Sequence, residues 1–295
     1  MRSFQTTVEL FQAYIQQQHW SITEEKSVKN GLQLFVTDGQ TQSPVICFAN
    51  GNALIQGAAS PLKTQLQTWW NLQKTLGETR ASPFKAHIGT DEAGKGDYFG
   101  PLVVAGVFVD EQTALQLRAL GVRDSKTLSD TAILSLADEI KRLCSPRHAH
   151  VLAYQPTQYN ELYQEVQNLN LLLAKAHAQT IQTMQRETQC QYALVDQFGP
   201  KALVAQALQA AGCQITLEQR THAEEDVAVA AASILARAAF LHDLERLSIE
   251  SLMELPKGAS APVVAAGRSL VAKSGRDGLG RVAKVHFKLT QAILQ

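Results

Sequence analysis

Two adjacent acidic residues followed by closely spaced glycines form the first candidate site in the sequence. Asp91 and Glu92 precede Gly94, Lys95 and Gly96. Neighbouring side chains on a strand project to opposite faces, so both acids can serve one site only where the chain turns. Glycines permit such a turn and let backbone N–H groups approach a phosphate closely. The segment therefore indicates either a site for a cation and a phosphate or a hairpin turn with solvated acids.

Further acidic residues stand where other predicted elements begin or end. Asp196 follows a short apolar strand, and Glu224, Glu225 and Asp226 open a strongly apolar helix. Acids at a helix N-terminus commonly serve only as caps. Taken together, the acids offer oxygen ligands without a paired set of His and Cys, which suits Mg²⁺ or Mn²⁺ better than zinc. Such ions can activate water and stabilise the leaving oxygen of a phosphodiester.

The elements that must position these acids alternate between strands and helices. A short strand from His87 leads into Asp91, and the unbroken apolar run 102–109 predicts a strand buried on both faces. His177 lies at helical spacing from Leu173 and Thr180, which favours a structural histidine. The alternation predicts an α/β core with a mixed sheet covered on both faces. Helices are predicted at about 111–120, 129–143, 157–188, 200–211 and 225–249.

The N-terminal part of the chain predicts a separate small α+β unit. Apolar residues recur at helical spacing over 3–22, strands are predicted at 31–36, 44–48 and 52–56, and a further helix at 62–76. A stretch with Ser-Pro follows and is typical of a linker. We expect an N-terminal domain over 1–80, a linker over 81–86 and a second domain over 87–295.

Charge is balanced over the whole chain but not along it. Lys and Arg number 27, as do Asp and Glu, and this balance taken alone argues against a nucleic-acid partner. Residues 1–85 carry +2, residues 86–255 carry −8 and residues 256–295 carry +6. An acidic middle beside a basic tail is typical of a cation-dependent site next to an anion-binding surface. Solvated helix charges would give the same pattern. The basic residues of the tail are Lys257, Arg268, Lys273, Arg276, Arg281, Lys284 and Lys288.

Cysteine spacing and hydropathy indicate the compartment. The four cysteines have no CxxC spacing, which argues against a zinc site and a disulfide framework and favours a reducing environment. No run of 18 apolar residues occurs, and the N-terminus lacks the apolar segment of a signal peptide. We therefore expect a cytoplasmic protein without a membrane partner.

Several motifs, in their order along the chain, resemble those of the type 2 ribonucleases H. The segment Thr-Asp-Glu-Ala-Gly-Lys-Gly-Asp-Tyr-Phe-Gly-Pro-Leu at 90–102 is similar to the family signature. Its Asp-Tyr-Phe-Gly-Pro part resembles ribonuclease HIII more closely than ribonuclease HII. The resemblance covers effectively the whole chain. It implies a ribonuclease H-like mixed sheet flanked by helices, preceded by a small α+β substrate-binding domain whose fold resembles a TATA-box-binding protein. Further similar segments lie at 124–128, 168–177, 195–198, 230–237, 255–259 and 282–287.

The resemblance also implies an activity and a set of ligands. Members of the family are endoribonucleases that hydrolyse the RNA strand of RNA–DNA hybrids and leave 5′-phosphate and 3′-hydroxyl ends. Four carboxylates hold two divalent ions, Mg²⁺ or Mn²⁺. Asp91 and Glu92 match the first pair and Asp196 matches the third, so these three are the expected catalytic metal ligands.

The fourth carboxylate is expected shortly before the Ala-Ala-Ala-Ser helix. Glu224 fits this context, with His222 in place of the usual Lys. It stands one residue closer to Ser233 than the family pattern predicts, however. Glu225 and Asp226 therefore stay open as alternatives, and Glu224 is the favoured catalytic residue.

Substrate contacts follow from the same resemblance. Gly94, Lys95 and Gly96 are expected to read the ribose 2′-hydroxyl through backbone contacts, because glycine permits close approach. Ser125 and Lys126 are expected to contact a phosphate. An RNA–DNA hybrid is then the expected partner, with no obligate protein partner. The alternatives are excision of single embedded ribonucleotides, as by ribonuclease HII, and a non-catalytic protein that binds hybrids.

Overall fold

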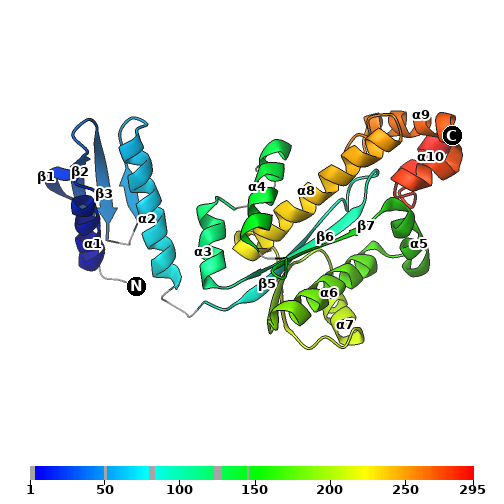
Figure 1. Ribbon diagram of the computed structural model, residues 1–295, viewed down its shortest axis with the longest axis horizontal. Helices are drawn as coiled ribbons and strands as arrows, with labels where there is room; N and C mark the ends of the chain where they lie inside the picture. The colour runs from blue at the N-terminus through cyan, green and yellow to red at the C-terminus, as the bar shows by residue number, and fades with distance from the viewer. Residues whose placement is uncertain (1–3, 50–51, 80–83, 123–127, 145) are drawn as a thin grey trace. The chain divides into compact units, whose positions relative to one another are not determined.

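The computed structural model divides the chain into two units, Met1–Phe84 and Lys85–Gln295 (Figure 1). This division falls within the predicted linker over 81–86, of which 81–83 lie outside the described residues. Each unit has its own buried core and is described by itself. The structure describes residues 4–49, 52–79, 84–122, 128–144 and 146–295.

The N-terminal unit consists of an antiparallel sheet and two helices. Its strand order is β1-β2-β3-β4, so each strand pairs with its neighbour in the sequence. Buried and less buried residues alternate along β2 and β3, as expected for strands with one face against a core. In that core the ring of Phe11 lies 5.1 Å from Trp69 and 5.3 Å from Trp70. The elements are α1 (Phe4–Gln17), β1 (Ser21–Val28), β2 (Gly31–Thr37), β3 (Gln42–Phe48), β4 (Ala53–Ile55) and α2 (Pro61–Thr79).

Strand β1 differs from the sequence-based expectation. The predicted helix over 3–22 ends at Gln17, and a turn with His19 at φ +59° leads into the strand. The strand has the sequence Ser-Ile-Thr-Glu-Glu-Lys-Ser-Val and is mostly exposed, so it shows no alternation of apolar and polar residues. Its pairing with β2 makes it a strand.

The second unit is built on a five-stranded mixed sheet with strand order β7-β6-β5-β8-β9. Strands β5, β6 and β7 form an antiparallel meander, whereas β8 and β9 run parallel to β5. The predicted mixed sheet with helices on both faces is therefore confirmed. The strands are β5 (His87–Ala93), β6 (Leu102–Val109), β7 (Ala149–Tyr154), β8 (Tyr192–Asp196) and β9 (Thr216–Arg220).

Two long helices cover opposite faces of this sheet, α8 (Val227–Glu250) and α6 (Leu169–Thr188) (Figure 1). Successive residues of the central strand β5 face them in turn. A Cβ atom on Gly89 would overlap the backbone of Ala228 and Val229, so this glycine lets α8 lie directly on the strand. The next residue, Thr90, forms a hydrogen bond with His177 of α6 at 2.9 Å.

The helix predicted over 157–188 is two helices in the structure. The first ends at Val166, the next residue Gln167 adopts a left-handed conformation, and Asn168 caps the second by accepting hydrogen bonds from its first turn. The remaining helical elements of this unit are α3 (Glu111–Ala119), α4 (Asp130–Leu143), α5 (Pro156–Val166), α7 (Ala202–Ala210), the 3₁₀ turn η2 (Ala223–Glu225), α9 (Ala261–Val282) and α10 (Leu289–Leu294).

Helix α8 is long and apolar enough to cross a membrane by length and composition alone. In this structure, however, 72% of its most apolar window is buried inside the protein, and such burial is typical of a core helix. All four cysteines are buried free thiols.

Candidate active site

The adjacent acids of β5 face different helices. Asp91 forms a side-chain hydrogen bond with Ser233 of α8 and accepts one from the backbone N–H of Glu92 at 2.8 Å. Glu92 faces the opposite helix and accepts from Nε2 of His177 on α6 at 3.3 Å. The strand thus separates the two carboxylates, as alternation along a strand requires.

The turn predicted at the glycines follows directly after the strand, not between the two acids. Strand β5 ends at Ala93, and Gly94 has φ +83°. A Cβ atom on Gly94 would overlap the carbonyl of Pro101 and approach the ring of Phe240 within 2.9 Å. Only glycine fits this backbone and this packing. Gly96 has no such restriction, because an added Cβ would meet no described atom within 4 Å.

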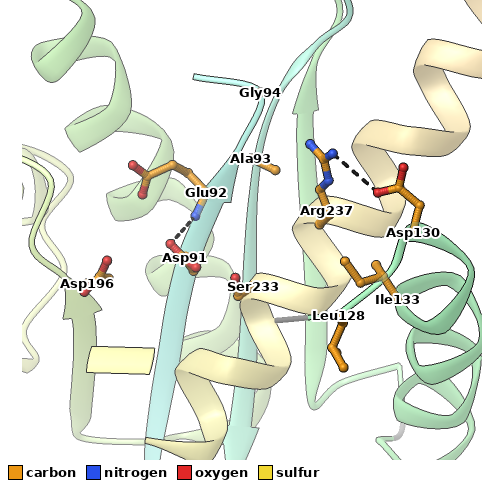
Figure 2. A pocket seen from close by; sticks show the side chains of 10 residues that line it. All are labelled: Asp91, Glu92, Ala93, Gly94, Leu128, Asp130, Ile133, Asp196, Ser233 and Arg237. Atoms are coloured by element: carbon orange, nitrogen blue, oxygen red, sulfur yellow. Dashed lines mark hydrogen bonds and ion pairs between the residues drawn. The ribbon is translucent and has the colours of Figure 1, made fainter. Parts of the chain in front are cut away.

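A pocket of 520 Å³ lies beside this turn (Figure 2). Asp91, Glu92 and Asp196 occupy one side of it, and Asp130 and Arg237 stand on the opposite side. The sequence placed the first three acids in one site, and the structure brings them to one pocket. The lining residues are Asp91, Glu92, Ala93, Gly94, Leu128, Asp130, Ile133, Asp196, Ser233 and Arg237.

Burial and neighbouring charges give the two adjacent acids opposite pKa shifts. Burial, followed by the charge of Glu92, raises the pKa of Asp91 to about 7, against the lowering effect of its hydrogen bond with Ser233. Burial also acts to raise the pKa of Glu92, but its hydrogen bond and ion pair with His177 and its contact with Lys95 hold that pKa below the ordinary value. At neutral pH Glu92 is ionised, whereas Asp91 is divided between its protonated and ionised forms.

The donor chemistry of the pocket fits a hard divalent cation. Its carboxylates are oxygen donors, and the charges of Glu92 and Asp196 both disfavour ionisation of Asp91, a repulsion that a bound cation would relieve. Among the described residues, no three His, Cys, Asp or Glu side chains already converge as a closed ligand set. Glu92, for example, is engaged by His177 at 3.3 Å and by Nζ of Lys95 at 3.5 Å.

The candidate fourth carboxylate lines a different pocket. Glu224 lies in η2, its side chain 14% exposed, in a 370 Å³ pocket that also contains His222 and Glu225. A hydrogen bond of 3.1 Å from the backbone N–H of Ala223 to Asp196 ties this turn to the end of β8. The role of Glu224 as a metal ligand therefore stays a prediction.

The alternative fourth residues differ in their surroundings. Asp226 caps α8, accepting from the N–H groups of Ala228 and Val229, and pairs with His87 at 2.9 Å. These contacts give Asp226 a structural role at the start of the helix. Glu225 is exposed.

The predicted substrate-binding residues have unequal outcomes. Gly94 lines the pocket, and Lys95 lies 3.5 Å from Glu92 with its ammonium group over the ring of Phe198 at 5.4 Å. Ser125 and Lys126 lie outside the described residues. Contacts of the segment 94–96 with a ribose stay a prediction.

His177 has a contact that the sequence analysis did not predict. The side chain is fully buried, as expected for a structural histidine, and its ring stacks on Phe198 at 5.0 Å. It also bridges Thr90 and Glu92, so it fixes one of the candidate ligands. Its position in the family-like segment 168–177 was the signal available in the sequence. Arg237 likewise ends a family-like segment, whereas nothing in the sequence singled out Asp130.

The basic tail is only partly available to a nucleic acid, and the expectation is wrong for Lys284. This side chain is fully buried and donates to the backbone carbonyls of Phe99, Gly100 and Pro101, the shortest bond being 2.6 Å to Gly100. Burial lowers the pKa of Lys284 to about 7. Lys284 therefore holds residues 99–101 of the signature segment in place and is not available to a phosphate.

Comparisons with known proteins agree with this architecture. The family model described as "Ribonuclease HII" matches residues 88–290, which places the catalytic unit in the class of type 2 ribonucleases H. Curated relatives named ribonuclease HIII include one from Protochlamydia amoebophila, 49% identical over 70% of this chain and 68% of its own. Another, from Chlamydia trachomatis, is 36% identical over 93% of this chain and 94% of its own. The chain belongs to the ribonuclease HIII family, as its motifs suggested.

Solved structures resemble both units. The crystal structure of Bst-RNase HIII in complex with Mn²⁺ matches with a TM-score of 0.68 and 27% identity, covering 100% of this chain and 97% of that one. RNase H3 from Aquifex aeolicus matches with a TM-score of 0.59 and 28% identity, over 96% of this chain and 97% of its own. The predicted fold class, with its additional N-terminal α+β domain, is thereby confirmed.

Proposed function

We propose that this protein is a divalent-metal-dependent endoribonuclease that cleaves the RNA strand of RNA–DNA hybrids. The observation that carries the proposal is the pocket in which Asp91, Glu92 and Asp196 lie beside the turn at Gly94. Membership of the ribonuclease HIII family and the Mn²⁺ in the Bst-RNase HIII crystal structure support it.

The carboxylates of the pocket would hold the metal ions. Two Mg²⁺ or Mn²⁺ ions, when bound, would supply an activated water and stabilise the charge on the departing 3′ oxygen. Asp91 and Asp196 would coordinate or bridge the ions, and Glu92 and Glu224 would complete the proposed set. Ser233 orients Asp91, and His177 keeps Glu92 ionised and in place. Hydrolysis of the bond between phosphorus and this 3′ oxygen would leave a 5′-phosphate and a 3′-hydroxyl.

The segment after Glu92 would distinguish RNA from DNA. Gly94 lines the pocket at this turn, and Gly96, two residues later, leaves open space where a side chain would stand. Backbone groups at such a position can reach the ribose 2′-hydroxyl, which DNA lacks.

A cleavage assay tests this function. An end-labelled RNA–DNA hybrid is incubated with Mg²⁺, with Mn²⁺ or with a chelator, beside a DNA duplex that contains one ribonucleotide. We expect cleavage within the RNA tract with a metal and none with the chelator. Absence of product with both metals would overturn the proposal, and efficient cleavage of the single-ribonucleotide duplex alone would favour the ribonuclease HII-like activity.

A non-catalytic role in hybrid binding is the competing function. Asp91→Asn removes a charge from the pocket and leaves the outer surface unchanged. Lost cleavage with retained hybrid binding excludes the non-catalytic role. Equal processing by the variant and the wild type would instead show that the pocket is not the active site.

A further inference from the structure

Two cations share one carboxylate on the wall of the pocket opposite the candidate metal ligands. Asp130, the first residue of α4, accepts from Nη2 of Arg237 at 3.4 Å and forms an ion pair with Nζ of Lys257. These interactions, the hydrogen bond from Lys257 foremost, lower the pKa of Asp130, so its carboxylate is ionised at neutral pH. Two positive charges and one negative charge leave the cluster with a net charge of +1.

Arg237 stands on the same helix as a partner of the candidate metal ligands. It lies one turn of α8 after Ser233, which contacts Asp91, and both side chains line the pocket (Figure 2). One helical turn is about 5.4 Å along the axis. The guanidinium group therefore faces the same space as the carboxylates, from the other side.

The arginine is also linked to the turn at Gly94. Its guanidinium carbon lies 5.2 Å from the centre of the Phe240 ring, and that ring packs directly beneath Gly94. The ring is fully buried and belongs to α8. Arg237 is thereby held between the turn proposed to read the ribose and the carboxylate of Asp130.

Donor capacity on this side chain is largely unused. Of the five N–H donors of a guanidinium group, one bonds to Asp130 within the described part of the chain, and the side chain is 27% exposed. The planar arrangement of the remaining donors suits two oxygens of a phosphodiester. Without bound metal the carboxylates opposite repel a polyanionic strand, so a cation on this wall would favour its binding.

From these contacts we propose that Arg237 binds a substrate phosphodiester next to the ribose held at Gly94, while Lys257 offsets the charge of Asp130. This inference rests on the proposed function, because it names a substrate contact within the same pocket. Asp130 holds the guanidinium in place, and Lys257 prevents the carboxylate from cancelling its charge.

A salt titration of hybrid binding tests the phosphate contact. A fluorescently labelled RNA–DNA hybrid is bound in EDTA, so that no cleavage occurs, over a range of KCl concentrations. For Arg237→Gln we expect the dissociation constant to rise about tenfold and the slope of log K against log[KCl] to fall by about one. Lys257→Gln should weaken binding less. The matched control is Arg142→Gln, which removes an arginine that is 69% exposed and pairs with Glu139 on the same helix as Asp130.

The position of the phosphate is tested with a modified substrate. Hybrids carrying one neutral methylphosphonate, placed in turn along either strand, remove single phosphate charges. The wild type should lose affinity at one position next to the ribose that is cleaved, and Arg237→Gln should be insensitive at that position. Sensitivity of both proteins at every position would overturn the assignment.

A second substitution at the same position distinguishes a folding defect from the loss of the phosphate contact. Arg237→Lys keeps the charge and the packing of the stem, so it should retain the salt slope while losing part of the affinity. If the wild type cleaves the hybrid but Arg237→Gln binds it as Arg142→Gln does in the salt titration, this inference is overturned and the proposed function is not. A wild type that cleaves with neither metal overturns the proposed function, while the titration in EDTA still decides the role of Arg237.

Discussion

The two faces of β5 hold adjacent carboxylates in contrasting surroundings. On the face toward α8, Asp91 forms a hydrogen bond with Ser233, and the charges of Glu92 and Asp196 disfavour its ionisation. On the face toward α6, Glu92 is held by His177 and Lys95. One strand therefore offers one carboxylate that is only partly ionised near neutral pH and one that is ionised and held in place. From this contrast we expect Glu92 to be held in place before a cation binds and Asp91 to ionise as the cation binds.

The largest expected effect is on the rate of hybrid cleavage, which should depend equally on the acids of the two faces of β5. Asp91→Asn and Glu92→Gln should each lower hybrid cleavage by at least about a thousandfold, because each removes a proposed metal ligand, whose loss would cost several kcal/mol of transition-state stabilisation. Single-turnover rates with saturating Mn²⁺ measure this loss. Glu139→Gln, a substitution on the exposed part of α4, is the control. If only one of the two variants is impaired, the acids do not form one site.

The next effect, on stability without metal, should differ in sign between the faces. A raised pKa of about 7 means that the contribution of Asp91 to stability is fully present below its unfolded pKa of about 4 and is lost as pH rises toward 7. Asp91→Asn should therefore stabilise the metal-free protein at pH 8 by up to about 4 kcal/mol and have little effect at pH 4.

Glu92→Gln should act in the opposite direction. Because the pKa of Glu92 is lowered, its stabilising contribution is present above the unfolded pKa and is lost as pH falls through the folded value. Thermal unfolding in chelator at the two pH values checks both variants. If Asp91→Asn instead destabilises the protein at pH 8, the two acids do not have opposite effects on the free energy of unfolding, and the contrast between the faces of β5 is wrong.

A smaller effect concerns competition between metal and proton. If Asp91 must lose a proton to bind a cation, the apparent affinity for Mn²⁺ should weaken about tenfold between pH 8 and pH 6. Calorimetry in two buffers of different ionisation enthalpy should detect the proton that binding releases. An affinity that is constant over this interval would show that Asp91 is already ionised.

The smallest effect is expected from the more exposed partner of Glu92. The Nζ of Lys95 lies 3.5 Å from Glu92 and its side chain is 36% exposed, so solvent screens the pair. Lys95→Gln should change the free energy of unfolding by about 0.5 kcal/mol or less. Chemical denaturation measures the difference. A large loss would mean that Lys95, rather than the buried His177, holds the carboxylate.

Much of the fold was predictable because its signals are local. The apolar run of β6 and the placement of Asp196 at the end of β8 follow from composition along short segments. Asp91 also lies on a predicted strand, although that strand continues to Ala93. Strand β1 was missed because its polar sequence contains no alternation, and only its partner β2 makes it a strand. The break at Gln167 was missed because it depends on a left-handed residue with no glycine to mark it.

The site was predictable only in part, since its supporting contacts join distant segments. Arg237 and Asp130 are 107 positions apart in the sequence, and His177 and Glu92 are 85 apart. Helical spacing shows that His177 is buried but not which strand residue it meets. The acids could be recognised from their types, whereas the groups that tune them required the packing of α6 and α8 on β5.

The contacts that residues 98–100 of the signature segment make near the C-terminus have a consequence for the order of folding. Residues 98–100 pair with the backbone of Val282 and Lys284, and the hydroxyl of Tyr98 bonds to Thr290, 192 positions further along the chain. A nascent chain emerging from the ribosome cannot complete this loop until those distant residues have been synthesised. All strands of the sheet and helix α8 precede these residues in the chain, so the sheet and its acids can form first. The ability to position a substrate would then be acquired only near the end of synthesis.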